Sequence, residues 1–267
     1  MNARQFIRDH RFSVFAAFVI VLGAATILAV DAATAPYALV LIPTVAAFAT
    51  AALAGQGDVS ALVARITRWR VRPVLYLAAL GIPLVATLLM VAGAVATGSP
   101  MSAAFSDLSA AALVVPLVVL LPALLEEIGW RGYGIPALGK RPLIVSAALV
   151  GVLFVGMHIP LHLPGYLYAD VPVWPTILST GGYAILVAWI FAAGRGSVLL
   201  AFLMHGAFNA FTPLTWGIDA TRIWEMRGIV VAVLAVIVLF LARRMFMAPL
   251  SEDTEAELVV REAPATV

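Results

Sequence analysis

The chain has 267 residues, of which 63% are apolar and only 11% are charged, and it contains no cysteine. A soluble domain carries about 25% charged residues, so this composition predicts a polytopic membrane protein. The absence of cysteine excludes a thiol nucleophile, cysteine-ligated zinc and disulfides. The net charge is only +2 and the arginines lie between apolar segments, so we expect the lipid bilayer, and no nucleic acid, as the partner of the basic residues.

Eight apolar segments come close to the roughly 20 helical residues that a bilayer core requires. We therefore expect an all-α, polytopic membrane protein with eight transmembrane helices. The predicted spans are 12–30, 36–54, 73–97, 109–129, 142–161, 175–193, 197–216 and 228–247. When the loops are numbered alternately, those that would face the cytoplasm hold most of the basic residues, so the positive-inside rule places both the N and C termini in the cytoplasm.

The chain is divided by these spans into three parts. Residues 1–72 hold two spans and a basic segment, 55–72. Apolar residues recur at helical spacing in this segment, so we interpret it as an amphipathic helix on the inner leaflet. The alternative is a plain basic connector. Residues 73–247 form a six-span region, which includes a candidate catalytic core at about 100–216. Residues 248–267 are acidic and predicted to be disordered.

Few polar side chains fall within the predicted spans. Glu126 and Glu127 are the only acids there, His158 and His205 the only histidines, and Asn209 the only side-chain amide. Ionisable groups in a bilayer are costly and usually functional, so we expect these five residues to converge on one buried site. Each alone has a structural alternative, such as an interhelical hydrogen bond or an interfacial ion pair.

The spacing of the acids assigns them different roles. Glu127 and Arg131 are separated by four residues, in the favourable order for an ion pair on one helix. Glu126 is turned by about 100° from Glu127 and has no basic residue three or four positions later. Glu127 is therefore predicted to be structural, whereas Glu126 is free to face a cavity as a general base.

The histidines share helix faces with other candidate residues. Phe154 and His158 lie four residues apart, as do His205 and Asn209, so each pair lies on one face. His162 also lies four residues from His158, but Pro160 separates them, and we favour an ordinary outer-loop role for His162 over a shared metal site.

The predicted span boundaries leave Glu126 and His158 at different depths in the bilayer. Glu126 lies near the inner end of its span, whereas His158 lies roughly 24 Å from the inner start of its own. The depths agree better if the fourth span continues past Trp130 to about Tyr133 and the fifth begins nearer Ser146, and we predict both corrections.

Two kinds of chemistry fit these residues. Two histidines and a carboxylate can bind Zn²⁺ or another divalent metal, with His158 and His205 as the ligands. Without a metal, a carboxylate and one histidine activate water, while the other histidine and the amide stabilise an oxyanion. Both mechanisms predict hydrolysis of an acyl bond, most simply a peptide bond. No G-x-S-x-G motif supports serine catalysis.

Three motifs then resemble one family of membrane proteins. E-E-x-x-x-R at Glu126–Arg131, F-x-x-x-H at Phe154–His158 and H-x-x-x-N at His205–Asn209 occur in that order, as in the CPBP family of intramembrane proteases. That family includes CAAX prenyl proteases, bacteriocin-processing enzymes and abortive-infection-type proteins. The resemblance covers about residues 100–216, together with the W-R-V sequence at 69–71.

The resemblance implies an intramembrane metalloendopeptidase and a role for each matched residue. Glu126 would activate water beside His158, His205 and Asn209 would complete the catalytic site, and Glu127, Arg131 and Phe154 would support it. The family is named as metalloproteases, yet the same residues are also interpreted as a metal-free glutamate protease. The expected substrate is a membrane-associated, prenylated or hydrophobic peptide or protein, and the expected location is a bacterial cytoplasmic membrane.

Two other classes of function remain as alternatives. A proton-coupled transporter would use Glu126 and the histidines as a relay. A non-catalytic membrane scaffold or immunity factor would keep the fold without the reaction. The sequence predicts no oligomeric state.

Overall fold

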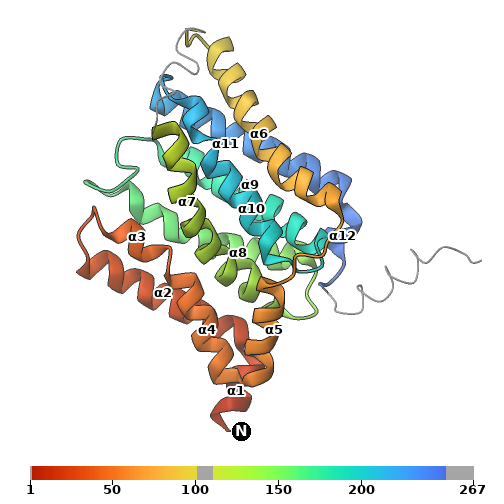
Figure 1. Ribbon diagram of the computed structural model, residues 1–267. Coiled ribbons are helices and arrows are strands. Elements are labelled where there is room, and N and C mark those ends of the chain that lie inside the picture. Colours follow the sequence, from red (N-terminus) through yellow and green to blue (C-terminus); the bar gives the residue numbers. More distant parts are fainter. Residues whose placement is uncertain (1, 101–110, 251–267) are drawn as a thin grey trace, which may run out of the picture.

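The computed structural model describes residues 2–100 and 111–250, and its elements there are all helices (Figure 1). The α-helices are α1 (Ala3–Asp9), α2 (Arg11–Ala29), α3 (Ala35–Leu39), α4 (Ile42–Ala54), α5 (Gln56–Ile66), α6 (Pro73–Ala96), α7 (Ala111–Glu127), α8 (Leu143–His158), α9 (Val173–Ala193), α10 (Val198–Ala210), α11 (Ala220–Leu241) and α12 (Arg243–Met247). The other elements are the π-helix η2 (Ile128–Gly134) and the 3₁₀ turns η3 (Pro136–Leu138), η4 (Ile159–His162) and η5 (Thr212–Thr215).

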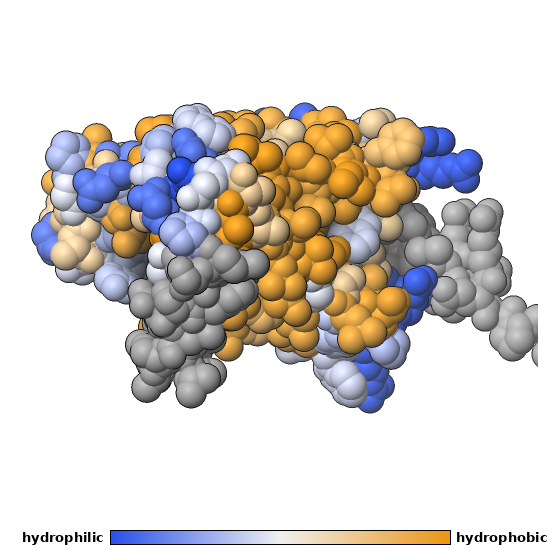
Figure 2. Space-filling model, turned by 90° about the horizontal axis from the view of Figure 1, so that it is seen from above, coloured by the Kyte–Doolittle hydropathy of each residue, from blue (hydrophilic) through white to orange (hydrophobic). Residues whose placement is uncertain are grey.

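Seven helical segments in the described residues are long and apolar enough to cross a membrane. They match every predicted span except the fourth, 109–129, which begins outside the described residues and contains α7. The count of eight and the cytoplasmic termini therefore stay predictions. The surface agrees with membrane-spanning helices. Figure 2 shows a broad apolar area in the middle of the molecule, with hydrophilic residues toward its ends.

The fourth predicted span ends later than hydropathy indicates. Helix α7 continues directly into the π-helix η2, which reaches Gly134, so the predicted continuation to about Tyr133 is confirmed. The other correction is wrong, because α8 begins at Leu143 and not near Ser146. Every residue of η2 is buried, and a buried π-helix is rare and frequently found at functional sites.

Two contacts with α4 accompany the change from α-helix to π-helix. The Thr44 hydroxyl donates a hydrogen bond to the Leu125 carbonyl, one of the backbone groups near this change of helix type. A Cβ atom on Gly129 would lie 2.3 Å from the Pro43 carbonyl carbon. Only glycine allows the two backbones to approach this closely, so Gly129 fixes the position of η2 against α4.

The basic segment before α6 is only partly helical. Helix α5 covers Gln56–Ile66, with Leu62 fully buried in the core. The predicted extension of helical structure past Ile66 is wrong, because α5 ends there and Trp69 is exposed. Arg11 forms a salt bridge with Asp58 at 2.5 Å, which ties α5 to the start of α2.

The predicted tail lies almost wholly outside the described residues. Its first residues, 248–250, are described, and the Ala248 carbonyl accepts a hydrogen bond from the Leu143 amide at 2.9 Å. This bond joins the chain after α12 to the start of α8. The part of the predicted core at 101–110 is also outside the described residues.

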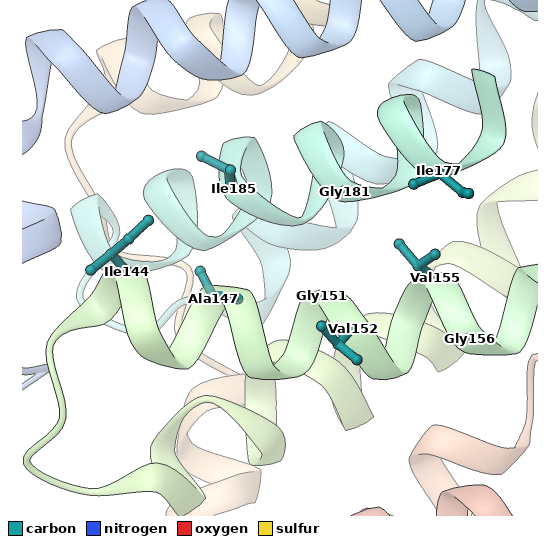
Figure 3. Close-up of a pocket in the computed structure, with 10 residues that line it drawn as sticks. Ile144, Ala147, Gly151, Val152, Val155, Gly156, Ile177, Gly181 and Ile185 are labelled. Carbon is teal, nitrogen blue, oxygen red and sulfur yellow. The ribbon is translucent and has the colours of Figure 1, made fainter. Parts of the chain in front are cut away.

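The helices around α9 form the largest packed unit. Helix α9 contacts α8, α10 and α11, and α10 also packs against α7 and α6. An apolar groove of about 380 Å³ runs between α8 and α9 (Figure 3). It is lined by Val152, Val155, Ile177 and their apolar neighbours, without a titratable side chain. The groove therefore cannot be the reaction centre.

Replacement of Gly129 by alanine should destabilise the protein by about 3 kcal/mol, near the upper end of the overpacking range. The reason is that the new Cβ meets the Pro43 backbone, which cannot rotate away as a side chain can. Thermal unfolding in detergent measures this effect. The control is Gly81→Ala on α6, where a Cβ meets nothing within 4 Å and the stability should stay within about 1 kcal/mol. Equal stability of the two variants would contradict the close-packing argument.

Candidate active site

A fully buried carboxylate, Glu127, lies at the centre of the candidate site. Its Oε1 accepts a hydrogen bond from Arg131 Nη1 at 3.0 Å and another from His205 Nδ1 at 2.8 Å. The predicted Glu127–Arg131 pair is present, with both side chains fully buried. The contact with His205 was not predicted. It joins the end of α7 to the middle of α10.

Aromatic rings enclose the Arg131 guanidinium. Its central carbon lies 5.2 Å from the centre of the Phe154 ring and 5.6 Å from that of the Tyr183 ring. A cation over an aromatic face gains a favourable interaction of about 2 kcal/mol when it is desolvated. The rings thus partly compensate for water that the guanidinium has lost.

The hydrogen bonds of the two histidines assign their tautomers. His158 Nδ1 lies 2.8 Å from the Phe154 carbonyl oxygen, which only accepts, so this nitrogen carries the proton. His205 Nδ1 donates in the same way to Glu127. In the neutral state of each ring, Nε2 therefore keeps a lone pair. Both imidazoles are held at one nitrogen and present the other for chemistry.

Phe154 links the two imidazoles. Its ring centre lies 4.7 Å from that of His158 and 6.3 Å from that of His205, in edge-to-face arrangements. Helices α8 and α10 thus bring both predicted histidines into contact with the Phe154 ring.

Glu126 and Asn209 border this network without joining it. Both are partly exposed, and neither takes part in a described hydrogen bond. Glu126 lies within electrostatic range of His205 and of Arg131. The Trp130 indole also acts on this carboxylate, although its Nε1 falls short of hydrogen-bond geometry. The structure places Asn209 one turn after His205 on α10.

The loop after α8 lies close to Glu126. Burial raises the pKa of the Tyr168 phenol, Arg227 lowers it, and the charge of Glu126 raises it again. Tyr168 packs between the rings of His162 and Trp224, with ring centres 5.5 Å and 4.8 Å away. This loop is therefore within reach of the Glu126 charge.

His162 has the predicted outer-loop role. Its Nδ1 donates to the Val171 carbonyl at 3.1 Å, and its Nε2 lies 2.8 Å from the Thr176 hydroxyl. The oxygen of that hydroxyl accepts a hydrogen bond from the Trp224 indole. Both nitrogens are engaged, so His162 holds the loop against α9 and α11. It has no free nitrogen with which to bind a metal beside His158.

Tyr183 is the main residue that the sequence did not single out. It lies on α9 with its ring centre 4.9 Å from that of His205 and 5.4 Å from that of Phe208. A tyrosine in an apolar span gives little signal, because its ring packs as readily as phenylalanine. The nearby glycine pair, Gly181–Gly182, is also not specific enough to identify it.

The predicted metal site has only part of the necessary geometry. A histidine with Nδ1 bound to an oxygen acceptor is typical of a metal ligand, so His158 and His205 are each suitable. However, the described residues contain no group of three or more His, Asp or Glu side chains placed to share a metal ion. The two histidines alone leave the metal prediction untested, and Zn²⁺ or another divalent ion stays a prediction.

Comparison with known proteins identifies relatives of this region. A family model described as type II CAAX prenyl endopeptidase Rce1-like matches residues 108–211. A curated protein of Methanococcus maripaludis named CAAX prenyl protease 2 is 30% identical over 134 residues. The aligned part is 47% of this chain and 49% of that protein, so the chain spans about half the length of the curated relative.

The neighbouring acids should differ in their effect on stability. Glu127→Gln leaves the Arg131 charge buried without its counter-ion, and we expect a loss of about 3–5 kcal/mol. Glu126→Gln removes a partly exposed carboxylate without a described hydrogen bond, so the change should stay within about 1 kcal/mol. Unfolding in detergent compares the two, and an equal loss in both would contradict the assignment of Glu127 as the structural acid.

Proposed function

We propose that this integral membrane protein is an intramembrane endopeptidase of the CPBP family, because residues 108–211 match the type II CAAX prenyl endopeptidase Rce1-like model and 134 residues align with a CAAX prenyl protease. It would hydrolyse a peptide bond in a membrane-associated, prenylated or otherwise hydrophobic substrate. The relative from Methanococcus is named as a prenyl protease, which supports this substrate class. We propose the bacterial cytoplasmic membrane as its location.

One observation carries the proposal most strongly. Glu127 holds Arg131 and His205 in a fully buried network, whereas the adjacent Glu126 stays partly exposed and within electrostatic range of His205. An active site needs both a fixed framework and an accessible reacting group. The two neighbouring acids supply one each.

In the proposed reaction, Glu126 removes a proton from water as the new C–O bond forms at the substrate carbonyl carbon. His158 Nε2, which has a lone pair in the neutral ring, helps to orient that water. The tetrahedral oxyanion is stabilised by the Asn209 amide and by protonated His205. The C–N bond then breaks, and the proton held by Glu126 passes to the leaving amine.

Glu127 would act on this reaction through His205. A carboxylate bound to Nδ1–H stabilises the positive charge that the imidazole carries when Nε2 is protonated, and it also fixes the ring orientation. Arg131 neutralises the same carboxylate and holds it in place. Phe154 packs against both imidazoles and limits their rotation. These residues position the catalytic groups and touch no reacting atom.

A metal-dependent version of the site remains a separate proposal. When bound, Zn²⁺ or another divalent ion would polarise the substrate carbonyl or activate the water, and His158 and His205 would hold it. Metal analysis of the purified protein, alongside the His205→Gln variant, separates the two versions. A bound metal lost with His205 supports the metal site, and full activity without metal supports the glutamate base.

The other two functions lack a supporting observation. The comparisons do not favour a proton-coupled transporter or a non-catalytic scaffold. Proton-linked flux in proteoliposomes would support the transporter. Absence of cleavage with every substrate class would support the scaffold or immunity factor.

Glu126→Gln should reduce cleavage of a prenylated or membrane-anchored peptide by about 10²–10⁴-fold, which is the contribution typical of a general base. Glutamine keeps the size of the side chain but cannot take the proton. The measurement is the product formed in detergent micelles, with kcat and KM determined separately. We expect the loss in kcat.

His162→Gln is the matched control for a polar residue outside the proposed reacting groups. Its loop contacts are hydrogen bonds to Val171 and Thr176, so activity should fall by less than tenfold while Glu126→Gln is nearly inactive. Full activity of a folded Glu126→Gln protein would end the proposed mechanism.

A further inference from the structure

A second cavity, of about 720 Å³, lies where α6 begins and α9 ends. It is separate from the candidate active site, since its lining includes no residue of that site. Its walls come from the segment before α6, the first turn of α6 and the turn between α9 and α10. The lining residues are Trp69, Arg70, Val71, Arg72, Pro73, Tyr76, Ala193, Gly194 and Arg195.

The lining of this cavity is strongly basic. Arg70, Arg72 and Arg195 are among the lining residues, and no acidic residue is part of the lining. The Arg70 guanidinium lies 5.0 Å from the centre of the exposed Trp69 ring. Three arginines at one concave surface favour an anion, and arginine is the side chain best suited to bind phosphate oxygens in pairs.

Hydrogen bonds hold the cavity walls in position. Arg68 donates to the Arg195 carbonyl at 2.6 Å, and the Ser197 hydroxyl donates to the Arg68 carbonyl at 2.6 Å. The Tyr76 hydroxyl donates to the Trp69 carbonyl. The non-helical segment 67–72 is therefore fixed at both ends of the cavity, between α6 and the α9–α10 turn.

Arg195 has an unusual backbone conformation. Its φ of 56° makes it the one non-glycine residue with a positive φ among the described residues, and it lies between Gly194 and Gly196. A left-handed conformation costs an L-residue roughly 1–2 kcal/mol that glycine avoids. A glycine would adopt this conformation without that cost, so the backbone strain makes the arginine side chain a candidate for a functional role.

The cavity lies at the ends of two helices of membrane-spanning length. Helices α6 and α9 are both long and apolar enough to span the bilayer, and the cavity is at their ends. Trp69 and Tyr76 match the aromatic residues that collect at membrane interfaces. Beyond the cavity, Val74, Leu77 and Leu80 expose apolar side chains along α6.

From this arrangement we infer that the cavity binds the phosphate headgroup of an anionic phospholipid. The arginines would contact the phosphate, and the acyl chains would lie along the exposed apolar side of α6. A free phosphate would use the arginines alone, whereas a lipid also covers this apolar surface. Basic pockets between membrane helices recognise anionic headgroups for the same reasons.

The test measures lipid binding and needs no peptidase activity, so its outcome is independent of the proposed reaction. Purified full-length protein in detergent is titrated with phosphatidylglycerol or phosphatidylcholine, and bound lipid is counted by native mass spectrometry. We expect phosphatidylglycerol to bind more tightly. Arg70→Gln and Arg195→Gly should each weaken its binding by about fivefold, since one arginine near an anionic lipid contributes about a fivefold change in affinity.

The Arg195→Gly variant separates binding from folding. Glycine adopts the same positive φ without strain, and Arg68 donates to the Arg195 backbone carbonyl, which this substitution keeps. The variant should therefore unfold at the same temperature as the wild type or higher, while it binds less lipid. Arg141→Gln is the matched control, because Arg141 is exposed and is not part of the lining.

Four results would overturn the inference. The first three are equal binding of the two lipids, unchanged phosphatidylglycerol binding in both arginine variants, and displacement of the lipid by equimolar inorganic phosphate. The third result would identify a site for free phosphate. Loss of binding in Arg141→Gln to the same extent would also contradict it, because general surface charge would then explain the affinity.

Discussion

The candidate site depends on one buried carboxylate with two donors. Two charges in a dry interior lose more in desolvation than a single ion pair usually regains, so Glu127 and Arg131 need further contacts to be tolerated. His205 supplies a second hydrogen bond to Glu127, and the rings of Phe154 and Tyr183 cover Arg131. Glu127 therefore links the end of α7 to α10 through His205, and Arg131 links the same pair to the rings on α8 and α9.

The π-helix η2 explains why Glu127 is buried although it is the last residue of α7. Because η2 follows α7 directly, the chain stays within the protein beyond Glu127. The π-helix continues α7 by the segment Ile128–Gly134 and keeps all of it buried. Gly129 lets the backbone contact α4 at Pro43, and Gly132 leaves space for Leu62 of α5 and Val198 of α10. Arg131 can lie within the protein because neighbouring helices cover the segment that carries it. The N-terminal helices thus help to form the site without contributing a reacting group.

Sequence reasoning succeeded where one helix determines the geometry. The Glu127–Arg131 pair follows from a four-residue spacing, as do the shared helix face of Phe154 and His158 and that of His205 and Asn209. Hydropathy also located seven spans. It misplaced the end of the fourth, because the polar residues after Leu125 lower the hydropathy although neighbouring helices bury them.

The contacts that sequence reasoning missed lie between helices. The bond from His205 to Glu127 joins residues 78 positions apart, and no local pattern predicts which donor reaches a buried acid. Tyr183 was missed because a single tyrosine in an apolar span has the periodicity of a core residue. The end of α5 at Ile66 was missed for a similar reason: the fold binds the following segment through Arg68 and Ser197, and these tertiary bonds replace helical ones.

The difference between Glu126 and Glu127 arises from their surroundings, because their chemistry is the same. Successive residues on a helix point about 100° apart, so one carboxylate faces α10 and the aromatic rings while the other keeps accessible surface. The buried acid has its geometry fixed by two donors, which removes it as a free base. Glu126 is only partly exposed and takes part in no described hydrogen bond, so no donor fixes its carboxylate in the same way. In the proposed reaction, Glu127 would therefore supply the fixed framework, and the adjacent Glu126 would supply the reacting carboxylate.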